Sequence, residues 1–160
     1  MREREAIFHE MGFDVKTAKL PEAGVIYAMA RTTNLVSRKL AGVYQPFGLT
    51  LASFNLLMLL KHGRDPGSFT QQAIGERLVV SPSNMTGLID RLERKQWVKR
   101  VPGSDRRCHL LRITSRGAAL LDQVWPHHAQ AIQRLAGALG KAEETTILRV
   151  LDRLRKTSLA

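Results

Sequence analysis

The chain has 160 residues, 44% of them hydrophobic, which is enough for about one folded domain and unlike a disordered chain. Its formal net charge of +11 favours an anionic partner. No apolar run approaches the roughly 18 residues that cross a bilayer, and the charged residues at 1–5 do not resemble a signal peptide. The single cysteine, Cys108, excludes an internal disulfide. We therefore expect a cytoplasmic protein with no membrane partner.

Two helices are expected early in the chain, after a mixed arm over residues 1–20. Apolar side chains recur every three to four residues between 23 and 44, which is typical of one face of a long helix. Pro46 and Gly48 should end it. Residues 50–61 are apolar on most sides, which favours a helix in the centre of the fold.

A pair of short helices is expected next, over residues 71–78 and 82–95. Thr70 and Ser81 can cap them, and Pro82 suits a first helical position, where its missing N–H costs nothing. The inward side chains of the second helix follow the spacing i, i+3, i+4, i+7: Met85, Leu88, Ile89 and Leu92. Its other sides are mostly polar: Ser83, Asn84, Thr86, Gly87, Asp90, Arg91 and Arg94.

A basic hairpin should follow, with strands over residues 97–101 and 108–113. Residues 91–116 hold nine Lys and Arg against only Glu93 and Asp105. A helix pair followed by an arginine-tipped hairpin is typical of a winged helix-turn-helix, which holds one helix in a DNA groove. The alternative is a solvated basic face with no partner.

Thr114 or Ser115 should cap a long helix over residues 116–139, which Pro126 should kink or divide into two. Gly140 should stop it, and residues 141–156 should form a last helix with one apolar face. The expected fold class is mainly α with a small β-hairpin: a winged helix-turn-helix flanked by N- and C-terminal helices.

The order of these blocks resembles the MarR family of bacterial transcriptional regulators from residue 23 onward. The blocks that carry the resemblance are residues 69–78, 80–86, 88–95, 105–107 and 111–117. The resemblance implies one domain over residues 1–160, with dimerisation helices at 22–46 and 116–158 and a winged DNA-binding region at 49–114. It implies a homodimer on a pseudo-palindromic operator, with repression as the expected sign and relief by a small aromatic or anionic effector. Gln96 is a departure, since the family usually has glycine after the recognition helix.

The residues divide into expected roles on double-stranded DNA. Ser83, Asn84 and Thr86 are candidates for base or phosphate contacts, and Arg106 and Arg107 for a narrow minor groove. Other basic residues, Arg100 and Arg112 among them, should track phosphates. The full set of expected DNA contacts is Thr70, Ser81, Ser83, Asn84, Thr86, Arg91, Arg94, Lys95, Lys99, Arg106 and Arg107.

Asp90 and Asp105 are expected to orient the wing rather than to touch DNA, because phosphate repels a carboxylate. In the family the matching aspartate pairs with a wing arginine, which implies a pair between Asp90 and Arg107. For each DNA candidate the alternative is an ordinary solvated side chain.

An effector would occupy a cleft between the dimer helices and the winged region. Its candidate lining is Met29, Thr33, Phe54, Met58 and Trp125, although all five are also ordinary core types. Enzyme chemistry has no support. The five histidines lack metal-ligand spacing, the neighbours His127 and His128 should face different ways, and no phosphate loop or nucleophile elbow occurs. We expect no metal and no cofactor.

Two other functions remain open. One is a broad-specificity architectural or silencing-antagonist protein on the nucleoid, which the high charge would suit. The other is a thiol-based redox regulator, because Cys108 stands beside Arg107, which could lower the pKa of its thiol. The sequence specifies neither the operator nor the regulated genes nor an effector.

Overall fold

The computed structural model describes residues 2–10, 12, 23–63, 69–78, 82–103 and 109–158. Their elements follow one another along the chain as α1 (Arg2–Glu10), α2 (Ala23–Tyr44), the 3-10 helix η1 (Gln45–Phe47), α3 (Leu51–His62), β1 (Phe69–Thr70), α4 (Gln71–Leu78), α5 (Pro82–Arg94), β2 (Val98–Pro102), β3 (His109–Ile113), α6 (Ser115–Ala136) and α7 (Lys141–Ser158). The expected fold class is confirmed, with helix ends within a few residues of those predicted.

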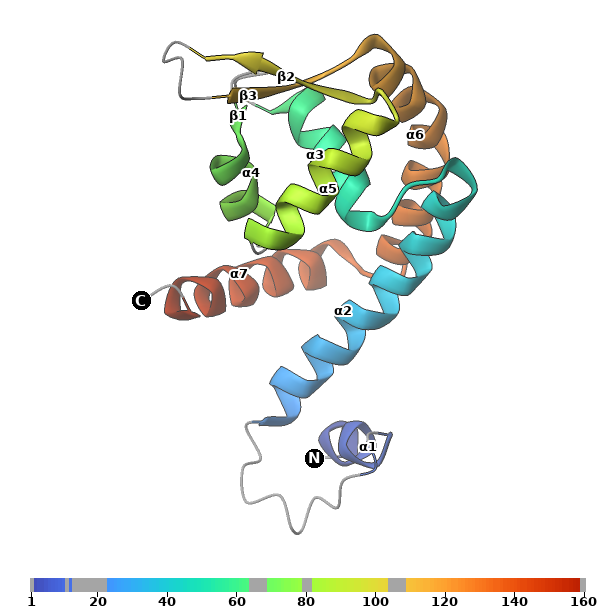
Figure 1. Ribbon diagram of the computed structural model, residues 1–160. Helices are drawn as coiled ribbons and strands as arrows, with labels where there is room; N and C mark the ends of the chain where they lie inside the picture. The colour runs from blue at the N-terminus through green and yellow to red at the C-terminus, as the bar shows by residue number, and fades with distance from the viewer. Residues whose placement is uncertain are drawn as a thin grey trace.

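The sheet lies at one end of the molecule, with α3, α4 and α5 packed below it and α6 along one side (Figure 1). Its strand order is β1-β3-β2, and both pairings are antiparallel. Val98 stands opposite Ile113 in the hairpin, and Phe69 stands opposite Leu111 on the other side of β3. β1 was not predicted, because a strand of this length is too short to show alternation.

α3 is the central helix, as its all-round apolar pattern predicted. Leu56, Leu57 and Leu60 are fully or almost fully buried. The ring of Phe54 stacks on that of Tyr44, at the end of α2, with 4.4 Å between centroids. Thr50 caps α3 by accepting a hydrogen bond from the Ser53 N–H. One core therefore joins the winged helices to α2 and α6.

α6 is a single helix that contains Pro126, so of the two expected effects of this proline, a kink or a division into two segments, the division does not occur. Pro126 is exposed, whereas the turn before it packs Leu121 and Val124 into the core. Burial of that turn keeps the helix continuous although proline cannot donate a backbone hydrogen bond. Thr114 is its cap and accepts from the Gly117 N–H at 3.1 Å.

Large apolar side chains remain exposed on the helices outside the winged region. They lie on α2, on α6 and just after it, and on α7: Val25, Ile26, Tyr27, Leu35, Trp125, Ile132, Leu139, Ile147, Leu148 and Leu151. Figure 1 shows α7 and the N-terminal half of α2 as arms that leave the packed part of the molecule. No single described helix is long and apolar enough to span a membrane, although residues 23–47 and 51–62, bent by 76°, pass that test as a pair.

Candidate nucleic-acid interface

α5 has a buried side and an exposed side, as its spacing predicted. Met85, Leu88, Ile89 and Leu92 are at most 2% exposed, and they fix the rotation of the helix on the core. The predicted polar residues are all exposed: Ser83, Asn84, Thr86, Gly87, Asp90, Arg91 and Arg94. A Cβ added at Gly87 would meet nothing within 4 Å, so the helix backbone is approachable there.

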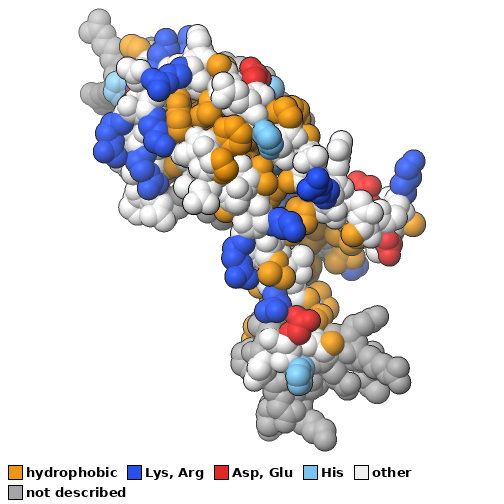
Figure 2. All heavy atoms as spheres, turned by 90° about the vertical axis from the view of Figure 1, so that its right-hand side faces the viewer, with side chains coloured by type: hydrophobic (Ala, Val, Ile, Leu, Met, Phe, Trp, Pro, Cys, Tyr) orange, Lys and Arg blue, Asp and Glu red, His pale blue; other side chains and the backbone are white. Residues whose placement is uncertain are grey.

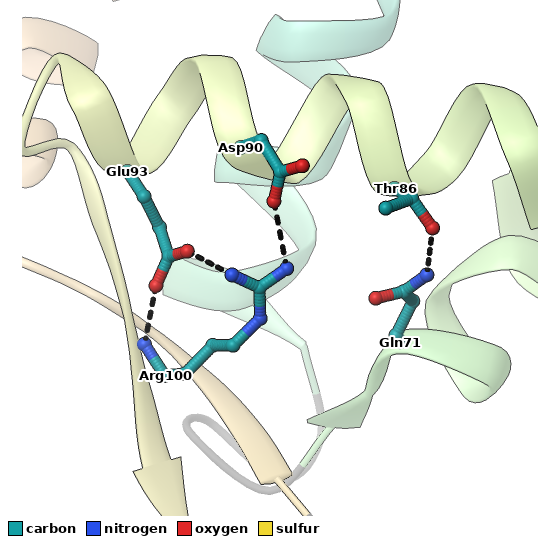
Figure 3. Close-up of polar contacts among 5 residues, drawn as sticks. All are labelled: Gln71, Thr86, Asp90, Glu93 and Arg100. Atoms are coloured by element: carbon teal, nitrogen blue, oxygen red, sulfur yellow. Dashed lines mark hydrogen bonds and ion pairs between the residues drawn. The ribbon is translucent and has the colours of Figure 1, made fainter.

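The start of the helix pair is held by side-chain hydrogen bonds. Thr70 caps α4, its Oγ1 accepting from the Ala73 N–H at 3.2 Å. Gln71 Nε2 donates to Thr86 Oγ1 across 2.7 Å, which joins the first turn of α4 to α5 (Figure 3). Of the predicted DNA residues, Thr70 thus also holds the start of α4, and Thr86 links α5 to α4.

Arg100 joins the wing to α5, a role that the sequence pattern did not reveal. Its guanidinium lies between two carboxylates of α5 (Figure 3): Nη2 is 2.9 Å from Asp90 Oδ1, and Nη1 pairs with Glu93 Oε2. The Arg100 backbone N–H also donates to Glu93 Oε1 at 3.0 Å. Charged and bidentate contacts of this kind fix orientation as well as distance. Strand β2 is therefore tied to the exposed side of α5.

This geometry gives Asp90 the orienting contact that was expected for it, but with Arg100, for which phosphate tracking was expected instead. The expected partner, Arg107, lies outside the described residues, as do Ser81, Asp105, Arg106 and Cys108. No spacing rule could have identified Arg100, because a contact between a strand and the preceding helix depends on how the two pack.

The turn that follows α5 is held against the turn before α3. Lys95 Nζ donates to the Gly48 carbonyl at 2.9 Å and lies 4.4 Å from the centroid of the Trp97 ring. Gln96 adopts φ 59°, the left-handed conformation that suits glycine best. Of the predicted basic DNA contacts, Arg91, Arg94, Lys95 and Lys99 are exposed.

The five candidate effector residues lie on three helices, α2, α3 and α6. Met29 and Thr33 line an apolar cleft of about 400 Å³ between α1, α2 and α7. Phe54 is buried, and Trp125 is 48% exposed on α6; their ring centroids are 4.7 and 5.4 Å from that of His128. Met58 is half-buried and packs against the core.

The two adjacent histidines face different rings, as their positions on one helix predicted. His127 packs against Phe47, whereas Nδ1 of His128 lies 2.8 Å from the buried hydroxyl of Tyr44. Burial raises the pKa of Tyr44 to about 12 and lowers the pKa of His128 from its ordinary value. Within the described residues no group of His, Cys, Asp and Glu could hold a metal ion.

Known proteins match this chain over most of its length. The model of the MarR family matches residues 49–109. The HTH-type transcriptional regulator MhqR of Bacillus subtilis is 30% identical over 67% of this chain and 72% of its own length. PecS of Dickeya dadantii, also an HTH-type transcriptional regulator, is 28% identical over 82% of this chain and 80% of its own length.

Among solved structures, the transcriptional repressor CouR bound to a 23-mer DNA duplex superposes with a TM-score of 0.75. It is 29% identical in sequence, and the match covers 89% of this chain and 99% of that one. MhqR and PecS are named as transcriptional regulators, and CouR as a transcriptional repressor. The chain belongs to the MarR family of DNA-binding, winged helix-turn-helix transcriptional regulators.

Proposed function

We propose that this protein represses transcription as a homodimer that places α5 of each subunit in the major groove of a pseudo-palindromic operator, and that a small ligand releases it. The observation that carries this proposal is the exposed polar side of α5, held by Arg100 on one flank and by Gln71 on the other. A recognition helix, the helix that contacts the bases, must be held rigidly, because base contacts depend on its position in the groove. CouR, whose structure was solved on DNA, is a repressor, which supports repression rather than activation of transcription.

The candidate DNA contacts on α5 and β2 divide by length and charge. Ser83, Asn84 and Thr86 are short and polar, and they suit base edges or nearby phosphates. Arg91, Arg94 and Lys99 are long cations that suit the phosphate backbone. Beyond the described residues, Arg106 and Arg107 remain our candidates for the minor groove, with Asp105 orienting them.

The exposed apolar side chains support the dimer. Ile147, Leu148 and Leu151 are each at least 40% exposed at helical spacing on α7. Val25 and Ile26 are similarly exposed on α2. Monomeric proteins rarely leave large apolar patches in water, and two copies related by a twofold axis would cover these patches on both subunits. Such a dimer would bind two half-sites whose centres lie about 34–36 Å apart. As a DNA-binding protein it would be located on the nucleoid, in the cytoplasm.

The first experiment is selection of genomic DNA by the purified full-length protein, followed by fluorescence anisotropy on the enriched sequence. We expect specific affinity at least about 10³-fold above that for random DNA. A ratio below about 100-fold would instead favour the broad-specificity architectural protein.

A paired substitution tests the role of α5. A Cβ added at Gly87 meets no atom within 4 Å in the free protein, yet Gly87→Leu should prevent close approach to the groove and weaken operator binding by about tenfold or more. The matched control is Asn55→Leu, at an exposed position of α3. Equal effects of the two variants would contradict the placement of α5.

Sedimentation of the free protein tests the dimer. Leu148→Asp should shift the molecule from dimer to monomer and weaken operator binding in parallel, since each half-site would then be bound alone. A monomeric native protein that binds the operator fully would contradict the dimer.

A further inference from the structure

A second cleft lies between the end of α5 and the turn before α3, and we call it the Trp97 cleft. Its lining includes Gly48, Thr50, Arg91, Arg94, Lys95 and Trp97. Its volume is about 480 Å³. Since liquid water occupies about 30 Å³ per molecule, the cleft has room for a phosphate group and several waters. None of the five predicted effector residues lines it.

The Trp97 cleft is cationic. Arg91, Arg94 and Lys95 line it and are exposed, and none of the three forms an ion pair within the described part of the chain. No carboxylate is among its described lining residues. Figure 2 shows Lys and Arg side chains gathered along one edge of the half of the molecule that contains the winged region. Cations gathered at one opening favour an anion, and an arginine fork can bind phosphate through two hydrogen bonds.

Lys95 is held in place before any ligand binds. Its Nζ donates to the Gly48 carbonyl at 2.9 Å and lies 4.4 Å from the centroid of the Trp97 ring. An ammonium group has three N–H donors, and the contact with Gly48 uses one of them. Because Lys95 is already ordered, it loses less rotamer freedom when it binds an anion than a free lysine would.

The Trp97 cleft borders the side of α5 that faces DNA in the proposed function. Ser83, Gly87 and Arg94 are separated by four and seven residues, so they lie in one line along the helix. All three are exposed. Arg94 therefore belongs both to this line and to the lining of the cleft.

The cleft and the wing lie on different flanks of α5. On one flank, Asp90 and Glu93 hold Arg100 of β2. Arg91 and Lys95 project about 100° and about 140° around the helix from Asp90, away from Glu93, and they line the cleft. A helix with its side chains is about 10–12 Å across, and the major groove is about 12 Å wide. A helix in the groove therefore lies close to the phosphates of both strands, one strand along each flank.

We propose that the Trp97 cleft binds a backbone phosphate of the operator strand that runs along the flank of α5 away from the wing. Arg91 and Arg94 donate to the phosphate oxygens, and Lys95 supplies a fixed positive charge. This site rests on the proposed function, because it requires α5 to lie in the major groove. It makes the turn before α3, which holds Lys95 through Gly48, a part of the DNA-binding surface.

The first test places a negative charge in the cleft without removing the cap of α3. The Thr50 hydroxyl accepts from the Ser53 N–H to cap that helix, so it is assigned no contact with the phosphate. Aspartate and asparagine cap helices at least as well as threonine. In the full-length protein we expect Thr50→Asp to weaken binding to the selected operator and to a random-sequence duplex by about tenfold, and Thr50→Asn by less than about twofold. Fluorescence anisotropy measures the affinities, and urea unfolding checks that both variants are folded.

The second test locates the phosphate on the operator. Each phosphate is replaced in turn by an uncharged methylphosphonate, and binding is measured for the native protein and for Arg94→Gln. One position in each half-site should cost the native protein about tenfold in affinity. The same position should cost Arg94→Gln less than about twofold, because the contact is already lost. Arg153→Gln, an exposed arginine on α7, is the matched control and should keep the native pattern.

Three outcomes would overturn the proposal. The first is equal binding by Thr50→Asp and Thr50→Asn to both duplexes. The second is a methylphosphonate pattern that Arg94→Gln shares with the native protein. The third is inorganic phosphate that stabilises the native protein against urea but not Thr50→Asp, while the two bind DNA equally, which would assign the cleft to free phosphate. The random-sequence duplex needs no specific operator, so failure of the proposed function remains distinguishable from failure of this site.

Discussion

Apolar side chains are buried in one part of the molecule and exposed in another. The first part is the winged region, from α3 to β3, and the second is the helical arms, which are α7 and the first half of α2. In the winged region most large apolar residues of α3, and all of those described on α5, are almost fully buried within one chain. On the arms, the apolar stripe of α7 is 40–60% exposed at Ile147, Leu148 and Leu151. The same helical periodicity therefore has two meanings. In one region it marks a completed core, and in the other an exposed surface that we propose is covered by a second copy of the chain.

The largest expected effect comes from truncating leucine in the winged region. Leu57→Ala removes a side chain with no exposed area and should lower the free energy of unfolding by about 2–5 kcal/mol. Leu148→Ala, at 60% exposure, should act mainly on self-association. Urea unfolding and sedimentation of both variants check this contrast. A cost below about 1 kcal/mol for Leu57→Ala would mean that the winged region does not carry the stability of the chain.

The next effect concerns the contact between wing and α5. Asp90→Ala should weaken operator binding although it makes the protein more positive, because Arg100 loses the carboxylate that orients it. A double-mutant cycle with Arg100→Ala, measured on operator affinity, should give a coupling energy of about 0.5–3 kcal/mol. Unfolding should change by less than about 1 kcal/mol, since the pair is partly exposed. Unchanged or tighter binding by Asp90→Ala would exclude the orienting role.

A smaller effect, on the pH dependence of the free energy of unfolding, should arise at His128 of α6, which contacts Tyr44 at the end of α2. Burial lowers the pKa of His128 from its ordinary value of 6.5, so the unfolded chain binds a proton at pH values where the folded chain does not. The free energy of unfolding should therefore fall as pH drops below about 6.5 and level off below the folded pKa. Tyr44, with its pKa raised to about 12, stays neutral throughout.

The measurement is urea unfolding between pH 5 and pH 8. His128→Gln should flatten this part of the profile, and His127→Gln, at an exposed position, should not. A profile that is the same in both variants would assign the pH dependence to other groups.

Much of the fold of the winged region could be predicted from the sequence, because local rules of residue spacing and capping determine it. The inward residues of α5, the caps Thr70 and Thr114 and the central position of α3 all follow from spacing and from backbone hydrogen bonding. Contacts across elements could not be predicted in this way. Lys95 reaches Gly48 only because the end of α5 packs beside the turn before α3.

The same limit applies at two other places. Pro126 leaves α6 undivided because the turn before it is held by the core, an effect of tertiary packing that decides between a kink and a division and that the proline rule does not include. The predicted effector lining depended on residue type and on a family-like arrangement of helices, and it stays a prediction, with Met29 beside an apolar cleft and Phe54 buried.

The smallest expected effect lies inside the winged region, at the turn from α5 to β2. Gln96 adopts φ 59°, and a residue with a Cβ pays roughly 1–2 kcal/mol for that conformation. Gln96→Gly removes this cost but increases the freedom of the unfolded chain by roughly 0.4–1 kcal/mol, and it also loses the exposed hydrogen bond from Arg116 to the Gln96 side chain. The net gain in the free energy of unfolding should be about 0.5–1 kcal/mol. Urea unfolding measures it, beside Gln72→Gly as a helical control that should lose stability.

The same variant should leave operator affinity unchanged. The hydroxyl of Thr114 donates to the Gln96 backbone carbonyl, which glycine retains, so the turn should keep its place. A loss of affinity in a more stable variant would show that the Gln96 side chain itself takes part in placing the wing.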